Sequence, residues 1–556
     1  MKKTATLMAL ATFLLCSPVA FAANYTWTNP GSDFYTNAAN WDLAAVPGSA
    51  DVADMANNGT ALYTDQMTNL LQKILLGGSD GSAGSVTMSG GVLSITNVEV
   101  NDAFMPGYWN SSSGTFILNG GTLTVARPST SARYFQDSFQ PGFGAGSTGT
   151  VTVNGGTLNI LCGFEAGISG DGFFNVNGGT VIANGFFTFA RGLTANQGTG
   201  SGTFNLTGGT VYVLKNGGTG DTVGMRILQL AANGTASISG GTLYCSTISL
   251  VNAASAGSGT LNVSGGNIYV GNGGVVIGNA TTAATKFINI SGGTFRTVDL
   301  LPNANGQGGL STVLSDGTNW TWAAANMPTI NLTTSPGPGV VTFAPEAGRT
   351  ITLNAPWAGA GGMTIAGANA AATVIFGATN NYTGNTTVSS GTLQLNASQP
   401  ASIIGGMSVG SGATLALSSA QTSASLGAAL SGGSMLQMNN GAQILDATLA
   451  LPSGATLKFN ASNTQLFTNN VSGAGNVIST LSGNGLEVVT GNLGHTGSTT
   501  ISNGIVAIGG TLNSSSGVIV TNTGTLAGNG VIGAPITVAS PNNPTATHLR
   551  IGNSPL

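Results

Sequence analysis

The sequence predicts an all-β fold, a right-handed parallel β-helix (β-solenoid) with three short strands and about 29 residues per coil. Two observations support this prediction. Charged residues make up 5% of the chain and glycine contributes 88 of 556 residues, whereas soluble domains carry about 25% charged residues and about 7% glycine. So few charges cannot cover amphipathic helices, and a phrase of strand, glycine corner and strand recurs eight times in the first half of the chain.

Each copy of this phrase has the pattern of two strands joined by a sharp corner. In GTFILNGGTLTV (114–125), Phe116 and Leu118 alternate with polar residues, and so do Leu123 and Val125. Such alternation is typical of strands with one buried face, and Asn-Gly-Gly accepts the positive φ of a tight corner. The first glycines of the eight pairs are Gly90, Gly120, Gly155, Gly178, Gly208, Gly240, Gly265 and Gly292.

A third, weaker strand is expected after each pair, at 143–146, 164–167 and 276–279, so that three strands and three turns close one coil. One coil alone cannot bury its apolar side chains, but coils stacked about 4.8 Å apart form a continuous core. Cys162 and Cys245 follow the inward pattern in the third and sixth units. At about 14 Å apart they should be buried thiols without a disulfide.

The chain divides into five segments. Residues 1–22 have the charged, apolar and small-residue regions of a signal peptide, with cleavage expected after Ala22 or Ala23. An N-terminal cap with the first coils is expected at 23–83, the Gly-Gly repeat solenoid at 84–299, a transition segment in which the coils continue at 300–362, and a second repeat solenoid at 363–556. No transmembrane helix is expected in the mature chain, because no apolar stretch approaches about 20 residues.

The second repeat type resembles a known family. NNYTGNTTVSSGTLQL (380–395), preceded by WAGAGGMTIAG (357–367), and NLGHTGSTTISNGIVAI (492–508) resemble the autotransporter-associated β-strand repeat of bacterial surface proteins, whose passenger regions adopt pectin-lyase-like β-helices. The resemblance implies secretion to the extracellular space or the outer cell surface of a bacterium. It also implies a C-terminal anchor, and the sequence ends at Leu556 without one. Truncation, release and attachment through another protein are the three alternatives.

Charge and histidine placement argue against several functions. Removal of Lys2 and Lys3 changes the net charge of −4 to about −6, and without a basic stripe to neutralise phosphates we expect no nucleic-acid partner. His495 and His548 stand alone, without acids or cysteines at metal-ligand spacing, so we expect no metal and no cofactor. His495, in a turn of the second repeat type, is expected at the surface.

These observations favour an exported structural or adhesive β-helix of passenger type without catalytic activity. The alternative is a polysaccharide-binding or polysaccharide-degrading β-helix. Cleavage requires clustered carboxylates, and the candidate column is Asp137, Glu165 and Arg191, about one coil apart, with Asp171 nearby. Isolated, solvated charges are the other interpretation of these residues.

Aromatic residues supply the candidates for a carbohydrate site. Trp27 and Trp41 lie in the cap, and Trp320 with Trp322 should project from one short strand on the same side. Such rings can stack on the sugars of extracellular glycans or of other cell-surface components. Packing inside the cap or the core is the alternative for all four.

Overall fold

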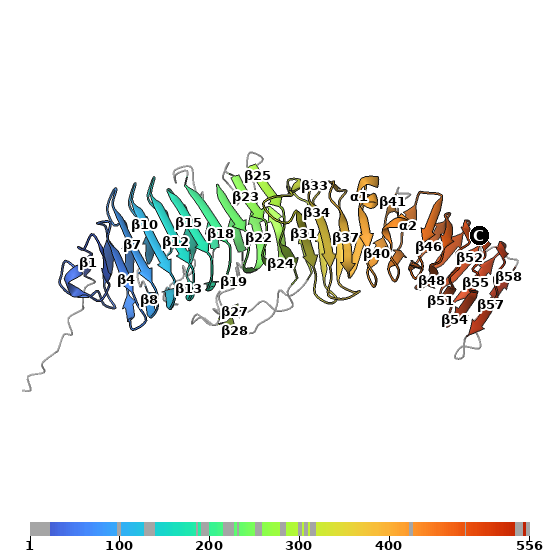
Figure 1. Cartoon of the computed structure of the whole chain (residues 1–556), viewed down its shortest axis with the longest axis horizontal. Helices are drawn as coiled ribbons and strands as arrows, with labels where there is room; N and C mark the ends of the chain where they lie inside the picture. Colours follow the sequence, from blue (N-terminus) through green and yellow to red (C-terminus); the bar gives the residue numbers. More distant parts are fainter. Residues whose placement is uncertain are drawn as a thin grey trace, which may run out of the picture.

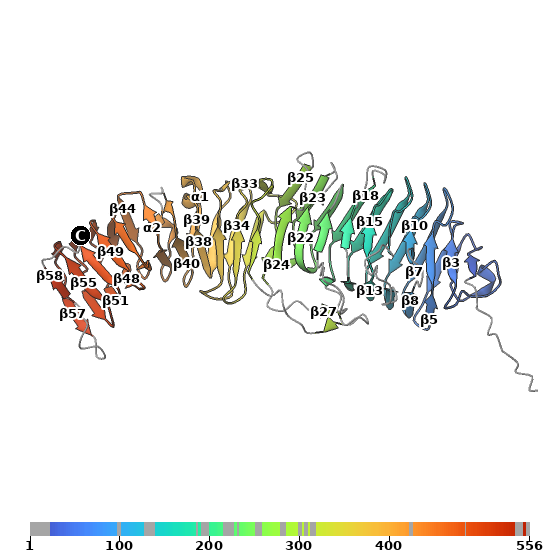
Figure 2. The same ribbon diagram turned by 180° about the vertical axis from the view of Figure 1, so that it is seen from behind.

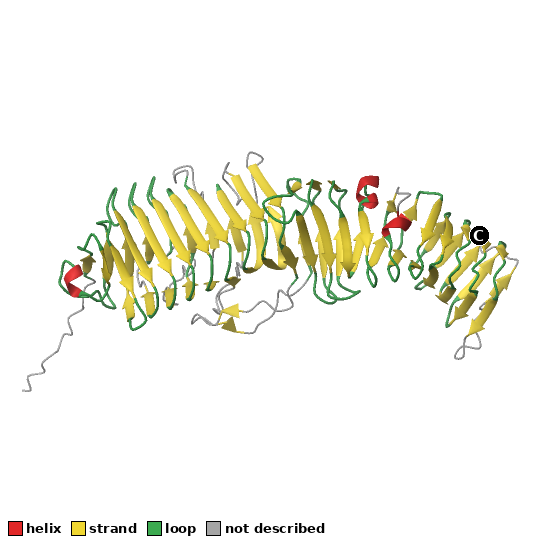
Figure 3. Ribbon diagram, viewed as in Figure 1, coloured by secondary structure: helices red, strands yellow, loops and turns green. Residues whose placement is uncertain are grey.

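The chain forms an elongated rod of stacked β-coils in the computed structural model (Figures 1 and 2). Strands run across the rod, and turns and loops join them (Figure 3). The helices of the described part are η1 (Ala38–Asn40), α1 (Ala401–Gly405) and α2 (Leu426–Ala429). The structure describes residues 23–96, 102–126, 139–184, 187–190, 200–214, 227–230, 233–250, 258–277, 285–297, 303–304, 310–311, 319–421, 426–483, 485–539 and 549–551.

One face of the rod is a sheet of thirteen parallel strands, each from a different coil. Phe116 of one coil lies beside Val86 of the preceding coil and Val151 of the following one, so the copies of the repeat stack in register. The strands in order are β2 (Ser32–Phe34), β4 (Thr60–Tyr63), β7 (Ala83–Met88), β10 (Ser113–Leu118), β12 (Thr148–Val153), β15 (Asp171–Val176), β18 (Ser201–Leu206), β21 (Gly234–Ile238), β23 (Ser258–Val263), β25 (Thr285–Ile290), β30 (Ile330–Leu332), β33 (Trp357–Gly359) and β36 (Asn381–Tyr382).

Three strands make one coil, which confirms the predicted parallel β-helix. One circuit consists of β12, then β13 (Thr157–Leu161), then β14 (Phe164–Ala166), and each pairs in parallel with its counterpart in the next coil. The third strand therefore lies where the sequence places it, at 164–166. In the preceding coil Phe139 carries these pairings, whereas the segment 143–146 belongs to the turn that follows.

Coil length changes along the rod. In the thirteen-stranded sheet, from β7 to β25, paired residues lie 23 to 35 positions apart, as in Val151 with Phe174 and Thr115 with Thr150, which matches the predicted average of about 29. Beyond β35 (Thr373–Phe376) the step falls to about 20, as in Phe376 with Leu395. The predicted coil length therefore holds for the first half only, because the second repeat type has shorter turns.

The transition segment continues the solenoid. β24 (Asn267–Ile277) pairs with β29 (Trp320–Trp322), and β25 pairs with β30, so the coils meet again across the insertion. The short strands β27 (Asn303–Ala304) and β28 (Leu310–Ser311) form an antiparallel pair inside this insertion. The pairing of β24 with β29 and of β25 with β30 agrees with the prediction that the solenoid continues here and is not interrupted by a globular domain.

Both copies of the second repeat phrase fold in the same way. The first supplies β36, β37 (Thr386–Ser390) and β38 (Thr392–Leu395); the second supplies β50 (Asn492–Leu493), β51 (Thr499–Asn503) and β52 (Ile505–Ile508). In each copy the middle strand carries a register shift near its end. The two similar sequences therefore form coils with the same strands and the same register shift.

The Gly-Gly corner is fixed by contacts between coils. A Cβ on Gly120 would lie 2.4 Å from the Ser89 carbonyl oxygen of the preceding coil, a separation that no side chain tolerates. Gly121 has φ of 80°, which an L side chain adopts only with strain. The corner therefore requires glycine at both positions: at Gly120 because the preceding coil lies too close for a side chain, and at Gly121 because φ is positive.

Polar side chains form ladders on the outside of the corners. Asn154 donates from Nδ2 to Oδ1 of Asn119 at 2.9 Å, and Asn177 donates in the same way to Asn154 at 2.9 Å. Thr207 extends the ladder by donating to Asn177. The rod thus satisfies its outer polar groups with neighbouring coils and with few charges.

One apolar core runs from Trp27 to Leu526. Cys162 and Cys245 are buried in it, three coils apart, and neither is part of a disulfide, as predicted. Burial raises the pKa of the Cys245 thiol to about 12, because a thiolate there would lose its hydration.

The predicted signal peptide and Ala22 lie outside the described residues. Ala23 begins the described chain, where its N–H donates to Oδ1 of Asp51 at 3.1 Å. Among the residues that the structure describes, no helix is long and apolar enough to cross a membrane.

Replacement of a corner glycine tests the stacking. We expect Gly120→Ala to lower stability by about 2 kcal/mol or more, because the new methyl group forces two coils apart. Gly405→Ala in α1 is the control, since a Cβ there has open space, and it should be neutral or slightly stabilising. Thermal unfolding followed by circular dichroism measures both; equal melting temperatures for the two variants would contradict the close stacking.

Candidate functional site

Trp27 and Trp41 are part of the cap's packing and not of its surface. Both are buried, and their ring centroids lie 5.1 Å apart at 83°. The Trp41 indole donates from Nε1 to the Tyr35 carbonyl at 2.9 Å, and Tyr35 packs edge-on against the same ring. These rings cover the first open coil of the core, so sugar stacking is the wrong role for them.

Trp320 and Trp322 project from β29 on the same side, as the sequence indicates, but that side faces the core. Both are buried. Trp320 donates from Nε1 to the Arg296 carbonyl at 3.1 Å, and Trp322 lies 4.8 Å from Trp357 at 75°. They fill the interior where the insertion rejoins the coils, and the stacking hypothesis fails for this pair too.

The candidate acidic column is not assembled in the described part of the chain. Asp137 and Arg191 lie outside the described residues. Glu165 is buried on β14, whereas Asp171 begins β15 in the thirteen-stranded sheet and accepts a hydrogen bond from Ser201 Oγ at 2.6 Å. Among the described residues, no three His, Cys, Asp or Glu side chains gather where they could hold a metal.

His495 is buried, which corrects the predicted surface position. Its Nε2 shares a hydrogen bond with Thr499 Oγ1 at 3.0 Å. The sister repeat explains the position, because Tyr382 is buried and bonds to Thr386 with the same spacing. Alignment of the two phrases would have revealed this equivalence. Burial lowers the pKa of His495 and favours the neutral ring.

Glu487 is a buried carboxyl that sequence reasoning missed. It lies on β49 (Leu486–Val489) beside Gln465 in the preceding coil and Val506 in the following one. Loss of hydration on burial raises its pKa to about 8. Side chains alternate along β49, so Glu487 lies on the same buried side as Val489. This alternation is the sequence signal that could have predicted its burial.

The exposed tryptophan is Trp109. All six tryptophans lie in the described residues; five are buried, and Trp109 is 45% exposed. It opens a turn after β9 (Phe104–Pro106), in which Ser112 donates from both its N–H and its Oγ to the Trp109 carbonyl. Pairs of tryptophans were the sequence signal for a carbohydrate site, and Trp109 has no second tryptophan near it in the sequence.

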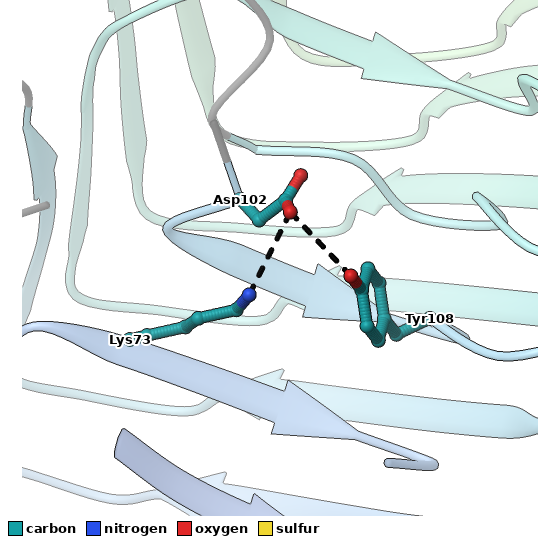
Figure 4. A network of polar contacts seen from close by, with 3 residues as sticks. All are labelled: Lys73, Asp102 and Tyr108. Carbon is teal, nitrogen blue, oxygen red and sulfur yellow. Dashed lines mark hydrogen bonds and ion pairs between the residues drawn. The ribbon is translucent and has the colours of Figure 1, made fainter. Parts of the chain in front are cut away.

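Tyr108, which precedes Trp109 in the chain, belongs to a polar network with Lys73 and Asp102 (Figure 4). Its hydroxyl makes a long hydrogen bond of 3.5 Å to Oδ2 of Asp102, which also lies 3.6 Å from Lys73 Nζ. Lys73 Nζ is 4.9 Å from the centroid of the Tyr108 ring, and Phe143 stacks 5.6 Å away at 19°. Burial and the Asp102 charge raise the Tyr108 pKa. The ring is thereby held in one orientation.

A groove of about 530 Å³ lies over the thirteen-stranded sheet. Asn289 donates to Asn262 at 3.0 Å along its floor, and Thr333, Ser335 and Pro336 form the other wall. The described residues that line it carry hydroxyls, amides and apolar groups, none of which titrates near neutral pH. Its chemistry suits a neutral ligand and offers no acid or base.

Comparison of the chain with protein-family models, curated proteins and solved structures gives no match. The family resemblance of the second repeat type therefore stays an expectation from its sequence.

Exchange of His495 tests the equivalence of the two repeats. His495→Tyr should keep stability within about 1 kcal/mol, because the sister coil holds Tyr382 in this slot, whereas His495→Ala should cost about 2 kcal/mol or more by leaving a cavity and an unpaired Thr499 hydroxyl. Urea unfolding compares them. If the tyrosine variant loses as much stability as the alanine variant, the slots are not equivalent.

Glu487 should make stability depend on pH. Its folded pKa of about 8 lies above the ordinary 4.5, so the folded state alone holds the proton between these values, and stability should fall as pH rises from about 4.5 to about 8 by on the order of 3 kcal/mol. Glu487→Gln should remove this fall, and Asp65→Asn, at an exposed carboxylate, should not. Urea titrations across this pH range that superimpose for wild type and Glu487→Gln would refute the assignment.

Proposed function

We propose that this protein is an exported structural or adhesive β-solenoid of passenger type, placed outside a bacterial cell and without catalytic activity. The observation that carries the proposal is the continuous parallel pairing of coils along the rod (Figure 1). The coils continue beyond this sheet through seven further strands, which pair in parallel one after another: β40 (Thr414–Leu417), β42 (Met435–Met438), β45 (Thr456–Phe459), β48 (Asn476–Thr480), β51, β54 (Val518–Thr521) and β57 (Ile536–Ala539). Twelve steps within the thirteen-stranded sheet and seven beyond it give about nineteen steps of about 4.8 Å, or about 90 Å of rod. A long, stiff and nearly uncharged body suits a spacer that holds contacts away from a surface.

Two further observations support a non-catalytic role. In the candidate acidic column, Glu165 is buried on β14 whereas Asp171 begins β15 in the thirteen-stranded sheet, and the groove is lined by neutral groups. The second repeat type, which resembles the passenger regions of bacterial surface proteins, forms regular coils. Together these favour a surface rod.

Polysaccharide binding is the second candidate function, and the groove favours it. Hydroxyls and amides along Ser237, Asn262 and Asn289 can exchange hydrogen bonds with the hydroxyls of a neutral sugar chain. Binding of this kind is compatible with an adhesive rod and requires no catalytic group.

The proposal is tested on the mature protein in two measurements. Small-angle X-ray scattering should give an elongated particle, and incubation with pectin, alginate, xylan and cellulose should release no reducing ends or unsaturated products. A compact particle would overturn the rod, and sustained cleavage of any of these glycans would overturn the non-catalytic role.

A further inference from the structure

We infer that the exposed indole of Trp109 is a contact site for the face of a neutral sugar ring in a polysaccharide. The inference rests on the adhesive part of the proposed function, to which it adds a ligand class and a residue. It concerns a corner of the N-terminal half that is separate from the groove.

Both neighbours of Trp109 along the rod are small. Three successive coils form the same turn at this corner: the N–H and Oγ of Ser82, Ser112 and Ser147 donate to the carbonyls of Ser79, Trp109 and Gly144. Ser79 and Gly144 therefore hold the position equivalent to Trp109 in the coils on either side. A serine and a glycine bring no ring or long side chain to pack on the indole, which stays 45% exposed. The ring of Tyr108, in contrast, is contacted by Lys73 and Phe143.

The indole is held in place before any ligand arrives. Tyr108 packs against it with centroids 5.2 Å apart at 75°, and Asp102, Lys73 and Phe143 fix Tyr108 in turn. The turn is tied to its neighbours as well, because Asn110 donates its N–H to Asp80 Oδ1 at 3.1 Å and accepts from the Ala145 N–H at 3.0 Å. A rigid aromatic anchor loses little entropy on binding.

The surroundings favour a sugar over the other ligands that stack on tryptophan. A protein partner needs about 800 Å² on each side, whereas the apolar surface here is one ring bordered by Ser79, Asp80 and Asn110. A nucleic acid needs cations along its backbone, whereas Asp80 is acidic. A sugar ring offers a face of C–H groups for the negative face of the indole and hydroxyls for Asp80 and Asn110.

Three proteins test the site: wild type, Trp109→Ala and Phe287→Ala. Phe287 is also an exposed aromatic residue, 50% accessible on β25, and serves as the matched control. The probes are insoluble cellulose, chitin and xylan, with polygalacturonate as an anionic polysaccharide and protein-coated beads that carry no glycan. We expect wild type and Phe287→Ala to bind at least one neutral polysaccharide, and Trp109→Ala to bind it about tenfold more weakly, or about 1.4 kcal/mol.

Iodide quenching gives a second readout. Because the other five tryptophans are buried, iodide should quench Trp109 selectively, and a soluble fragment of the bound polysaccharide should protect it. Equal binding by wild type and Trp109→Ala, no binding to any neutral polysaccharide, or Trp109-dependent binding to the protein-coated beads alone would each overturn the inference. None of these results would change the outcome of the scattering and cleavage measurements. Failure of the Trp109 site is therefore distinguishable from failure of the proposed structural role.

Discussion

The structure depends on hydrogen bonding between coils in register. Every coil presents its backbone N–H and C=O groups to the coils on either side, and a slip by one residue would turn the inward Val, Leu, Ile and Phe side chains outward. Burial of each such side chain contributes on the order of 2 kcal/mol, so the coils stabilise one another only while the register holds. The corner glycines matter for this reason: they let one coil lie against the next without a Cβ between them.

The repeat made most of the fold predictable. Alternation around Phe116 and Leu118 identified inward residues, and the same parity placed Cys162 and Cys245 correctly in the core. The predicted coil length holds for the first half only, because the period was counted on the repeats between Gly90 and Gly292 and the coils of the second repeat type are shorter. The strand expected at 143–146 lies at Phe139 instead, because two aromatic residues four positions apart give a pattern that a single sequence does not resolve.

Side chains off the repeat were harder to place. The sequence around a buried tryptophan in the cap does not differ in kind from the sequence around an exposed tryptophan on a turn. The side chains of the neighbouring coils determine whether the indole is buried. Trp27 and Trp41 meet other aromatic rings and are buried, whereas Trp109 meets Ser79 and Gly144 and is exposed. His495 illustrates the same point, because its environment follows from Tyr382 in the sister coil and not from its own polarity.

The asparagine and threonine ladders have a consequence for the medium in which the rod works. Dissolved ions screen the attraction between exposed charges, over a length of about 10 Å at 0.1 M salt that shortens as salt rises, but they have little effect on hydrogen bonds between neutral amides and hydroxyls. A surface built from Asn119, Asn154 and Asn177 holds its coils together equally in fresh water and in brine. Such a rod would keep its shape across media of widely different salinity.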